Sequence, residues 1–170
     1  TQTMRMASRL QQDTDHEVVV YTKSYQGEEV HDTEFDLVRV PNLSISDFIS
    51  TLTFTIVAFL YILRDRHNID ILHCMMIYPT GFLGYLVHQS VGIPYFAWIR
   101  GGDYYFMKEN RLKRWMIDRV FHDSLVLVQT DAVREDVHCE FPHATLRVLG
   151  NGVAIPTETA SGDSVVFVGR

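Results

Sequence analysis

The chain has 170 residues, a length that favours one folded domain with a piece of a second. Its residues are 46% hydrophobic and 21% charged, which is ordinary for a globular domain. Its formal net charge of -6 argues against general nucleic-acid binding, because that function needs a basic surface. The two cysteines, Cys74 and Cys139, lie far apart without CxxC spacing. This favours free, buried thiols in a reducing, cytoplasmic compartment, with one disulfide as the alternative.

Apolar periodicity predicts helices and strands that alternate along most of the chain. A polar loop containing Gly27 is expected over residues 25–34. In chain order, the expected elements are helix 1–12, strand 16–22, strand 35–40, helix 48–63, strand 69–76, helix 82–91, strand 94–99, a helix or helix pair over 104–121, strand 124–130, helix 131–140 and strand 145–149.

Residues 48–63 are nearly all apolar and are the one segment that raises the question of a membrane span. Ser44 or Ser46 can cap the helix, and Asp47 suits its first turn. Crossing a bilayer takes about 20 apolar residues. This run is shorter and is diluted by serine and threonine, so a helix packed against a sheet is the favoured interpretation.

Alternating strands and helices predict an α/β fold, namely a Rossmann-like parallel sheet with helices on both faces. Polar side chains gather where the predicted strands end, while the strand interiors carry almost none. Because the carboxyl ends of parallel strands share one edge, these groups are expected to meet in one crevice, towards which helix N-termini also point. The polar positions include Thr22, Lys23, Ser24, Asn42, His73, Arg100, Asp103, Thr130, Asp131 and Asn151.

The stretch PYFAWIRGGD, residues 94–103, is the centre of this predicted site. A buried strand ends there in Gly101 and Gly102, flanked by Arg100 and Asp103. Paired glycines can adopt positive φ and allow a ligand close to the backbone, although a tight turn is the simpler reason for them. Arg100 either contacts a ligand or pairs with Asp103.

Several of these residues have a structural alternative. Asp103 either binds an acceptor hydroxyl or caps the next helix, and Asp131 is most simply an N-cap. His73, at a strand end, is either a core or rim histidine or a substrate contact. Residues 104–121 interleave basic and aromatic side chains, which suits either a solvated helix face or contact with an anionic membrane surface.

Common catalytic and nucleotide-binding motifs are missing from the sequence. No GxGxxG loop follows a strand, and there is no P-loop, GxSxG elbow or HExxH pair. His138, Cys139 and His143 fit no common zinc spacing and precede or follow a proline bend, so structural or surface roles are expected and no metal site is predicted.

The order of the motifs DILHC, PTGFLGYLVHQSVGIPYFAWIRGGD, LVLVQTDAVREDV, VLGNGV and VVFVGR resembles the retaining glycosyltransferases of the GT-B fold, family 4 type. On this resemblance, residues 1–155 form the N-terminal, acceptor-side domain without its first strand, 156–163 a linker, and 164–170 the start of a truncated nucleotide-sugar-binding domain. The first residues look like the middle of a helix, and the last look like a strand that stops as its following loop begins, so a fragment of a longer protein is expected.

The resemblance implies transfer of a sugar from a nucleotide diphosphate sugar to a glycan or lipid-linked acceptor, with retention of configuration and without a metal or other cofactor. Family members commonly carry a histidine where this chain has Arg100, and the arginine suits a diphosphate or an acidic acceptor. Asn151 and Gly152 resemble the family's interdomain turn, and Arg170 resembles its contact to the donor diphosphate. Gly101, Gly102 and His73 are further expected substrate contacts.

Two other functions remain open from the sequence. The first is a sugar-nucleotide epimerase of the same two-domain architecture. The second is a non-catalytic module that binds a nucleotide or a glycan. A cytoplasmic location is expected for the transferase, with peripheral contact at a membrane through residues 104–121 as one of the two interpretations of that segment.

Overall fold

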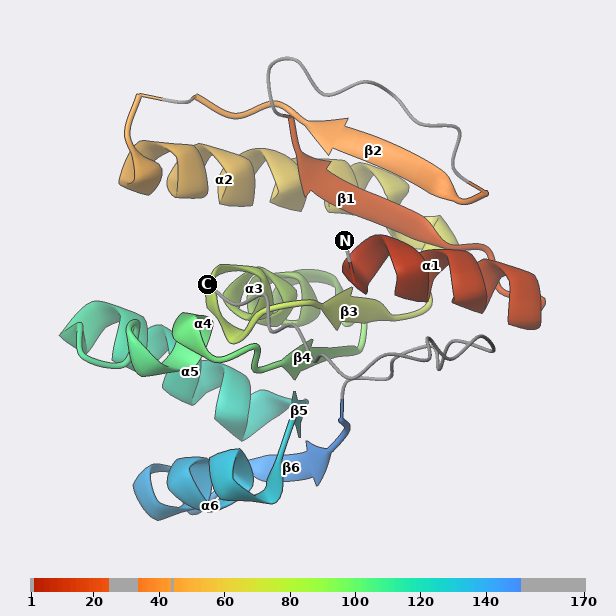
Figure 1. Ribbon diagram of the computed structural model, residues 1–170. Helices are drawn as coiled ribbons and strands as arrows, with labels where there is room; N and C mark the ends of the chain where they lie inside the picture. The colour runs from red at the N-terminus through yellow and green to blue at the C-terminus, as the bar shows by residue number, and fades with distance from the viewer. Residues whose placement is uncertain (1, 25–33, 44, 151–170) are drawn as a thin grey trace, which may run out of the picture.

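The computed structural model describes residues 2–24, 34–43 and 45–150, and the alternation of helices and strands predicted from the sequence is confirmed there (Figure 1). The predicted linker and second-domain strand lie outside the described residues. In chain order the elements are α1 (Gln2–Asp13), β1 (Val19–Lys23), β2 (Asp36–Val40), α2 (Asp47–Asp65), the short helical turn η1 (Arg66–Asn68), β3 (Leu72–Cys74), the turn η2 (Ile77–Gly81), α3 (Phe82–Val91), β4 (Tyr95–Trp98), α4 (Gly102–Tyr105), α5 (Arg111–Asp123), β5 (Leu125–Val128), α6 (Asp131–Glu140) and β6 (Thr145–Val148).

All the described strand pairs are parallel, as predicted, but they form two sheets where the sequence suggests one. β1 pairs with β2, and a second sheet has the order β3-β4-β5-β6. The long helix α2 joins β2 to β3, and these two strands are not hydrogen-bonded neighbours. In Figure 1, α1 lies in front of the strands and α2 behind β1 and β2. β3 (Leu72–Cys74) is shorter than the predicted strand 69–76, and among the described strands it pairs with β4.

Helix α2 packs one of its faces inward. Of the two predicted caps, Ser46 accepts a hydrogen bond from the Ile49 backbone N–H, and Ser44 lies outside the described residues. Phe54, Ala58 and Ile62, spaced four residues apart, are buried in a cluster with Val40 of β2 and with α3. This spacing places all three on one helical face, as the sequence predicts for a helix packed on a sheet.

The opposite face of α2 is apolar and exposed. Phe48, Leu52, Ile56 and Leu60 follow the same four-residue spacing and are between 47% and 66% exposed. Among the described helices, the segment Asp47–Asn68 is long and apolar enough to cross a membrane, and 17% of its most apolar window is buried. The length and composition of α2 are therefore compatible both with packing against a sheet and with contact to lipid. Its inner face packs against the sheet.

The main core lies between the four-stranded sheet and helices α3 to α6. Tyr95 and Ala97 of β4 and Ile99 just after it point into this core, together with Val126 and Val128 of β5 and with Ile117, Val120 and Phe121 of α5. Successive side chains of a strand point to opposite faces. Phe96 and Trp98 consequently lie on the other face of β4, which leads to the site described below.

Gly84 allows α3 to approach the sheet closely. A Cβ atom at this position would lie 2.6 Å from Tyr95 Cδ2 and 2.7 Å from Cys74 Sγ. Both neighbours are buried, so neither can move away easily.

Both cysteines are free thiols, as predicted. Cys74 is buried, but Cys139 is exposed on α6, so the expectation of burial is wrong for Cys139.

Gly84→Ala should destabilise the fold by about 1–3 kcal/mol, because overpacking a close helix-strand contact costs more than the gain in helix propensity. Urea unfolding followed by circular dichroism measures the change. Ser90→Ala in the same helix is the control, and its free energy of unfolding should stay within about 0.5 kcal/mol of the wild type. A stabilised Gly84→Ala variant would contradict the close packing.

Candidate functional site

The loop after β4 makes a sharp turn at Gly101. Its φ of 112° lies in the region that favours glycine, and Gly101 is the residue just before α4. The Gly101 carbonyl accepts hydrogen bonds from the backbone N–H groups of Tyr104 and Tyr105, at 2.9 and 3.0 Å. A Cβ atom on Gly101 would meet no described atom within 4 Å, so the backbone faces open space there. At Gly102 the same test meets the Phe106 ring at 3.2 Å.

Asp103 fixes this turn from inside. Its side chain is 4% exposed, its Oδ1 accepts from the Arg100 N–H at 2.9 Å, and its Oδ2 accepts from the Ile77 N–H at 2.8 Å. Burial raises the pKa of the Asp103 carboxyl, and the backbone N–H donors oppose that rise. The carboxylate thus ties the loop after β4 to the turn after β3. The residue at the cap position of α4 is Gly101, so the prediction that Asp103 is the N-cap is wrong.

His73, two aromatic rings and Arg100 form a row on one face of the sheet. His73 of β3 lies opposite Phe96 of β4, and their rings stack with centroids 4.3 Å apart. The Trp98 ring lies 6.0 Å from the His73 ring, and the Arg100 guanidinium lies 5.1 Å from the centre of Trp98. Strand pairing and the alternation of β4 therefore bring His73 and Arg100 together, as the sequence predicts for groups at one sheet edge. The two aromatic members of the row were not singled out by sequence reasoning.

His73 is held uncharged by these neighbours. Desolvation, and secondly the positive charge of Arg100, lower the pKa of His73 to about 4. Its Nε2 atom is buried and has no hydrogen-bond partner among the described residues. A buried nitrogen without a partner is uncommon in a folded domain, so the ring is poised to hydrogen-bond a group that the described chain does not supply.

The other predicted positions are only partly covered. Asn151, Gly152 and Arg170 lie outside the described residues. At the end of β5, the Thr130 hydroxyl accepts from the Val133 N–H and caps α6, so the prediction that Asp131 is the N-cap is wrong. Asp131 instead lies in the first turn and pairs with Arg134 at 2.8 Å. Both residues are typical caps, and only the backbone geometry decides between them.

These observations define a parallel α/β domain of Rossmann type, with an arginine and a glycine turn at the carboxyl end of a central strand. Residues 1–155 match the family model described as Glycosyltransferase Family 4. The chain therefore belongs to glycosyltransferase family 4, and its parallel strands fit the N-terminal half of a GT-B fold. No curated protein matches the chain. Membership assigns glycosyl transfer as the general class of activity.

The low pKa of His73 predicts a pH dependence of stability. An unfolded histidine titrates near pH 6.5, so between pH 6.5 and about 4 the unfolded chain binds a proton at His73 that the folded chain excludes. Stability contributed by the neutral ring is therefore present above pH 6.5 and lost as the pH falls through this window. His73→Phe keeps a flat ring and should lose less stability between pH 7 and pH 4.5 than the wild type.

Chemical denaturation at a series of pH values measures this difference. His67→Ala, which removes an exposed histidine of η1, is the control and should keep the wild-type slope. Parallel curves for the wild type and His73→Phe would show that the imidazole titrates normally in the folded state.

Proposed function

We propose that this domain is the acceptor-side half of a retaining glycosyltransferase that uses a nucleotide diphosphate sugar and modifies a glycan or a lipid-linked acceptor. Membership of glycosyltransferase family 4 supports the class of reaction. The polar groups that follow β3 and β4 support the location, because open parallel sheets bind ligands at the carboxyl ends of their strands. Closure of a nucleotide-sugar-binding domain over this edge would exclude water and align the acceptor hydroxyl with the anomeric carbon.

The observation that carries the proposal is the way Arg100 is presented. Asp103 holds its backbone N–H, the Gly101 turn follows it at once, and Trp98 lies under its guanidinium. A guanidinium is a permanent planar cation whose fork matches phosphate and carboxylate groups. Stacking on an indole restricts the orientation of that plane before any ligand arrives. Arg100 is therefore assigned to stabilising the leaving diphosphate or to binding an acidic acceptor.

Each neighbour of Arg100 receives a role consistent with its surroundings. Asp103 is assigned as a positioning residue, because backbone N–H groups occupy both of its oxygens. Gly101 and Gly102 are assigned to the close approach of substrate, and open space at Gly101 supports this. His73 is assigned a hydrogen bond from an uncharged ring, since its pKa of about 4 leaves it neutral in the cytoplasm.

Contact with a membrane surface is proposed through residues 104–121, which form the end of α4, a loop and most of α5. Phe106, Leu112 and Trp115 are 78%, 59% and 46% exposed. Exposed aromatic side chains flanked by basic ones favour the interface of anionic bilayers. Lys108 and Arg114 both pair with Glu140, which lowers the positive charge available to lipid. A cytoplasmic, peripheral location follows from this proposal.

Arg100→Ala in the full-length protein should lower kcat by about 100-fold or more, as expected for loss of a preorganised charge at a leaving group. Arg100→Lys keeps the positive charge without the planar fork of donors, so its kcat should lie between those of the wild type and Arg100→Ala. Release of nucleoside diphosphate from UDP- and GDP-sugars, with product analysis, measures the effect. Arg66→Ala is the control, because Arg66 is an exposed arginine of η1 at the opposite end of β3.

An unchanged rate in Arg100→Ala would remove the proposed role of this arginine. A free epimerised sugar nucleotide as the only product would point to an epimerase. Donor binding without turnover would point to a binding module. An anomeric product of inverted configuration would contradict retention.

The double variant Phe106→Ser with Trp115→Ser should bind vesicles of phosphatidylcholine and phosphatidylglycerol at least about tenfold more weakly than the wild type, because two buried aromatic contacts of the interface are lost. Co-sedimentation measures binding, and vesicles of phosphatidylcholine alone report the part that depends on anionic lipid. Phe48→Ser, on the exposed face of α2, is the control. Loss of binding in Phe48→Ser alone would move the contact to α2.

A further inference from the structure

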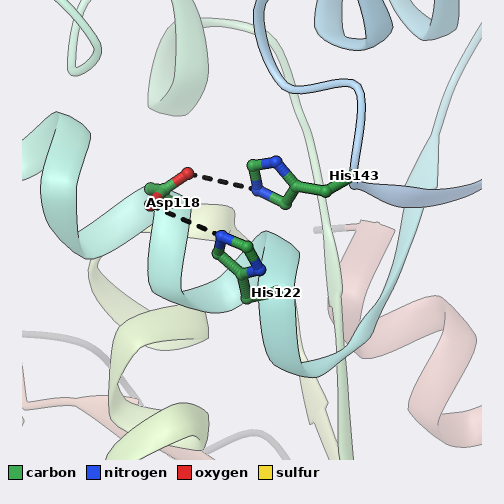
Figure 2. Close-up of side chains that lie close together, drawn as sticks. All are labelled: Asp118, His122 and His143. Atoms are coloured by element: carbon green, nitrogen blue, oxygen red, sulfur yellow. Dashed lines mark ion pairs between the residues drawn. The ribbon is translucent and has the colours of Figure 1, made fainter.

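Two histidines and an aspartate meet on the surface between α5 and the turn before β6. Asp118 and His122 lie one helical turn apart on α5, and His143 follows α6 (Figure 2). The Nε2 of His143 lies 3.2 Å from Asp118 Oδ1, and the Nε2 of His122 lies 3.9 Å from Asp118 Oδ2. The two imidazole rings stack with centroids 3.7 Å apart. One donor atom from each of the three residues lies within 4.8 Å of the other two.

This cluster is separate from the glycosyltransferase site. His122 lies three residues before β5 and His143 two residues before β6, so the cluster sits at the amino ends of these strands. Arg100 follows the carboxyl end of β4, which is parallel to β5. The two sites therefore lie at opposite edges of the same sheet. Binding at one edge does not require the other to be intact.

The donor set suits a borderline transition metal. Imidazole nitrogen and carboxylate oxygen are common zinc ligands, at about 2.0–2.2 Å, whereas Mg²⁺ and Ca²⁺ prefer oxygen alone. Ligand atoms around a tetrahedral zinc ion lie about 3.4 Å apart at these bond lengths. The Nε2–oxygen distances of 3.2 and 3.9 Å bracket that separation. An imidazole nitrogen binds a metal in the plane of its ring, so one of the two stacked rings must turn out of the stack for both nitrogens to reach one ion. Figure 2 shows both Nε2 atoms directed at the carboxylate.

Charge also favours a cation at this position. The Asp118 carboxylate supplies a negative charge that a divalent ion complements. Asp118 and His143 also line a surface pocket of about 360 Å³, which gives the ion an entry path and room for a water ligand. Arg111 and Arg114 line the same pocket, and Arg114 is paired with Glu140 there.

We propose that Asp118, His122 and His143 form a binding site for Zn²⁺, with water in the remaining coordination position. The ion links the C-terminal half of α5 to the turn between α6 and β6, two segments otherwise joined through β5 and α6. The spacing of residues in the sequence does not reveal this site. The potential ligands close to His143 in the sequence are His138 and Cys139, whereas its partners in the structure come from α5.

The test is a calorimetric titration of the full chain with Zn²⁺ alone. The wild type should bind one ion at this site, and His122→Gln and His143→Gln should each weaken the affinity by at least about tenfold, since even an outer-shell partner is worth that much. Both residues are exposed, so the substitutions should leave the fold intact, which circular dichroism checks. Zn²⁺ should also raise the Tm of the wild type and not that of His143→Gln.

The matched control removes a histidine and a cysteine of α6 that are not part of the proposed site. His138→Ala with Cys139→Ser, both exposed on α6, should bind Zn²⁺ as the wild type does. Asp118→Asn keeps the size of the side chain and should weaken binding like the histidine variants. The proposal is overturned if the wild type does not bind Zn²⁺, if all variants bind equally, or if only the His138 and Cys139 variant loses binding.

Discussion

The buried carboxylate of Asp103 joins the loop after β4 to the turn after β3, where its partner Ile77 lies 26 residues earlier in the chain, and the geometry of the site depends on this junction. One oxygen holds the Ile77 N–H at the start of the turn after β3, and the other holds the Arg100 N–H after β4. Burying a carboxylate is costly unless such donors surround it. The same donors would be left without partners if the carboxylate were absent. Asp103 therefore makes the position of Arg100 a property of the core.

Alternate side chains of β4 point to opposite faces of the sheet, and the two faces have different roles. Tyr95 and Ala97, with Ile99 beyond the strand, face the helices and complete the main core. Phe96 and Trp98 face the other way, where they carry His73 and Arg100 in one stacked row. The aromatic surface that keeps His73 neutral is thus the surface on which the guanidinium lies. The packing and the electrostatics of the proposed substrate site around Arg100 and His73 therefore depend on the same few side chains.

The parallel arrangement also gives the sheet two chemically different edges. The loop after β4 carries the glycine turn and Arg100, while the end of α5 and the turn before β6 carry His122 and His143. A cation site at the second edge would strengthen the framework without meeting the substrate. Trp115 of α5 lines the same surface pocket as Asp118 and His143, so the proposed lipid contact and the proposed cation site adjoin on this helix.

Local chemistry in the sequence determined the order and type of the elements, a serine cap for α2, the glycine turn after β4 and the parallel α/β class. These follow from periodicity and from backbone preferences over a few residues. Tertiary structure decided the matters that depend on distant segments. They include the Ile77 partner of Asp103, the cap at Thr130, the exposure of Cys139, the division into two described sheets and the meeting of Asp118 with His143. The physical reason is that a polar atom is satisfied by whichever donor the fold brings to it, and sequence spacing says nothing about that donor.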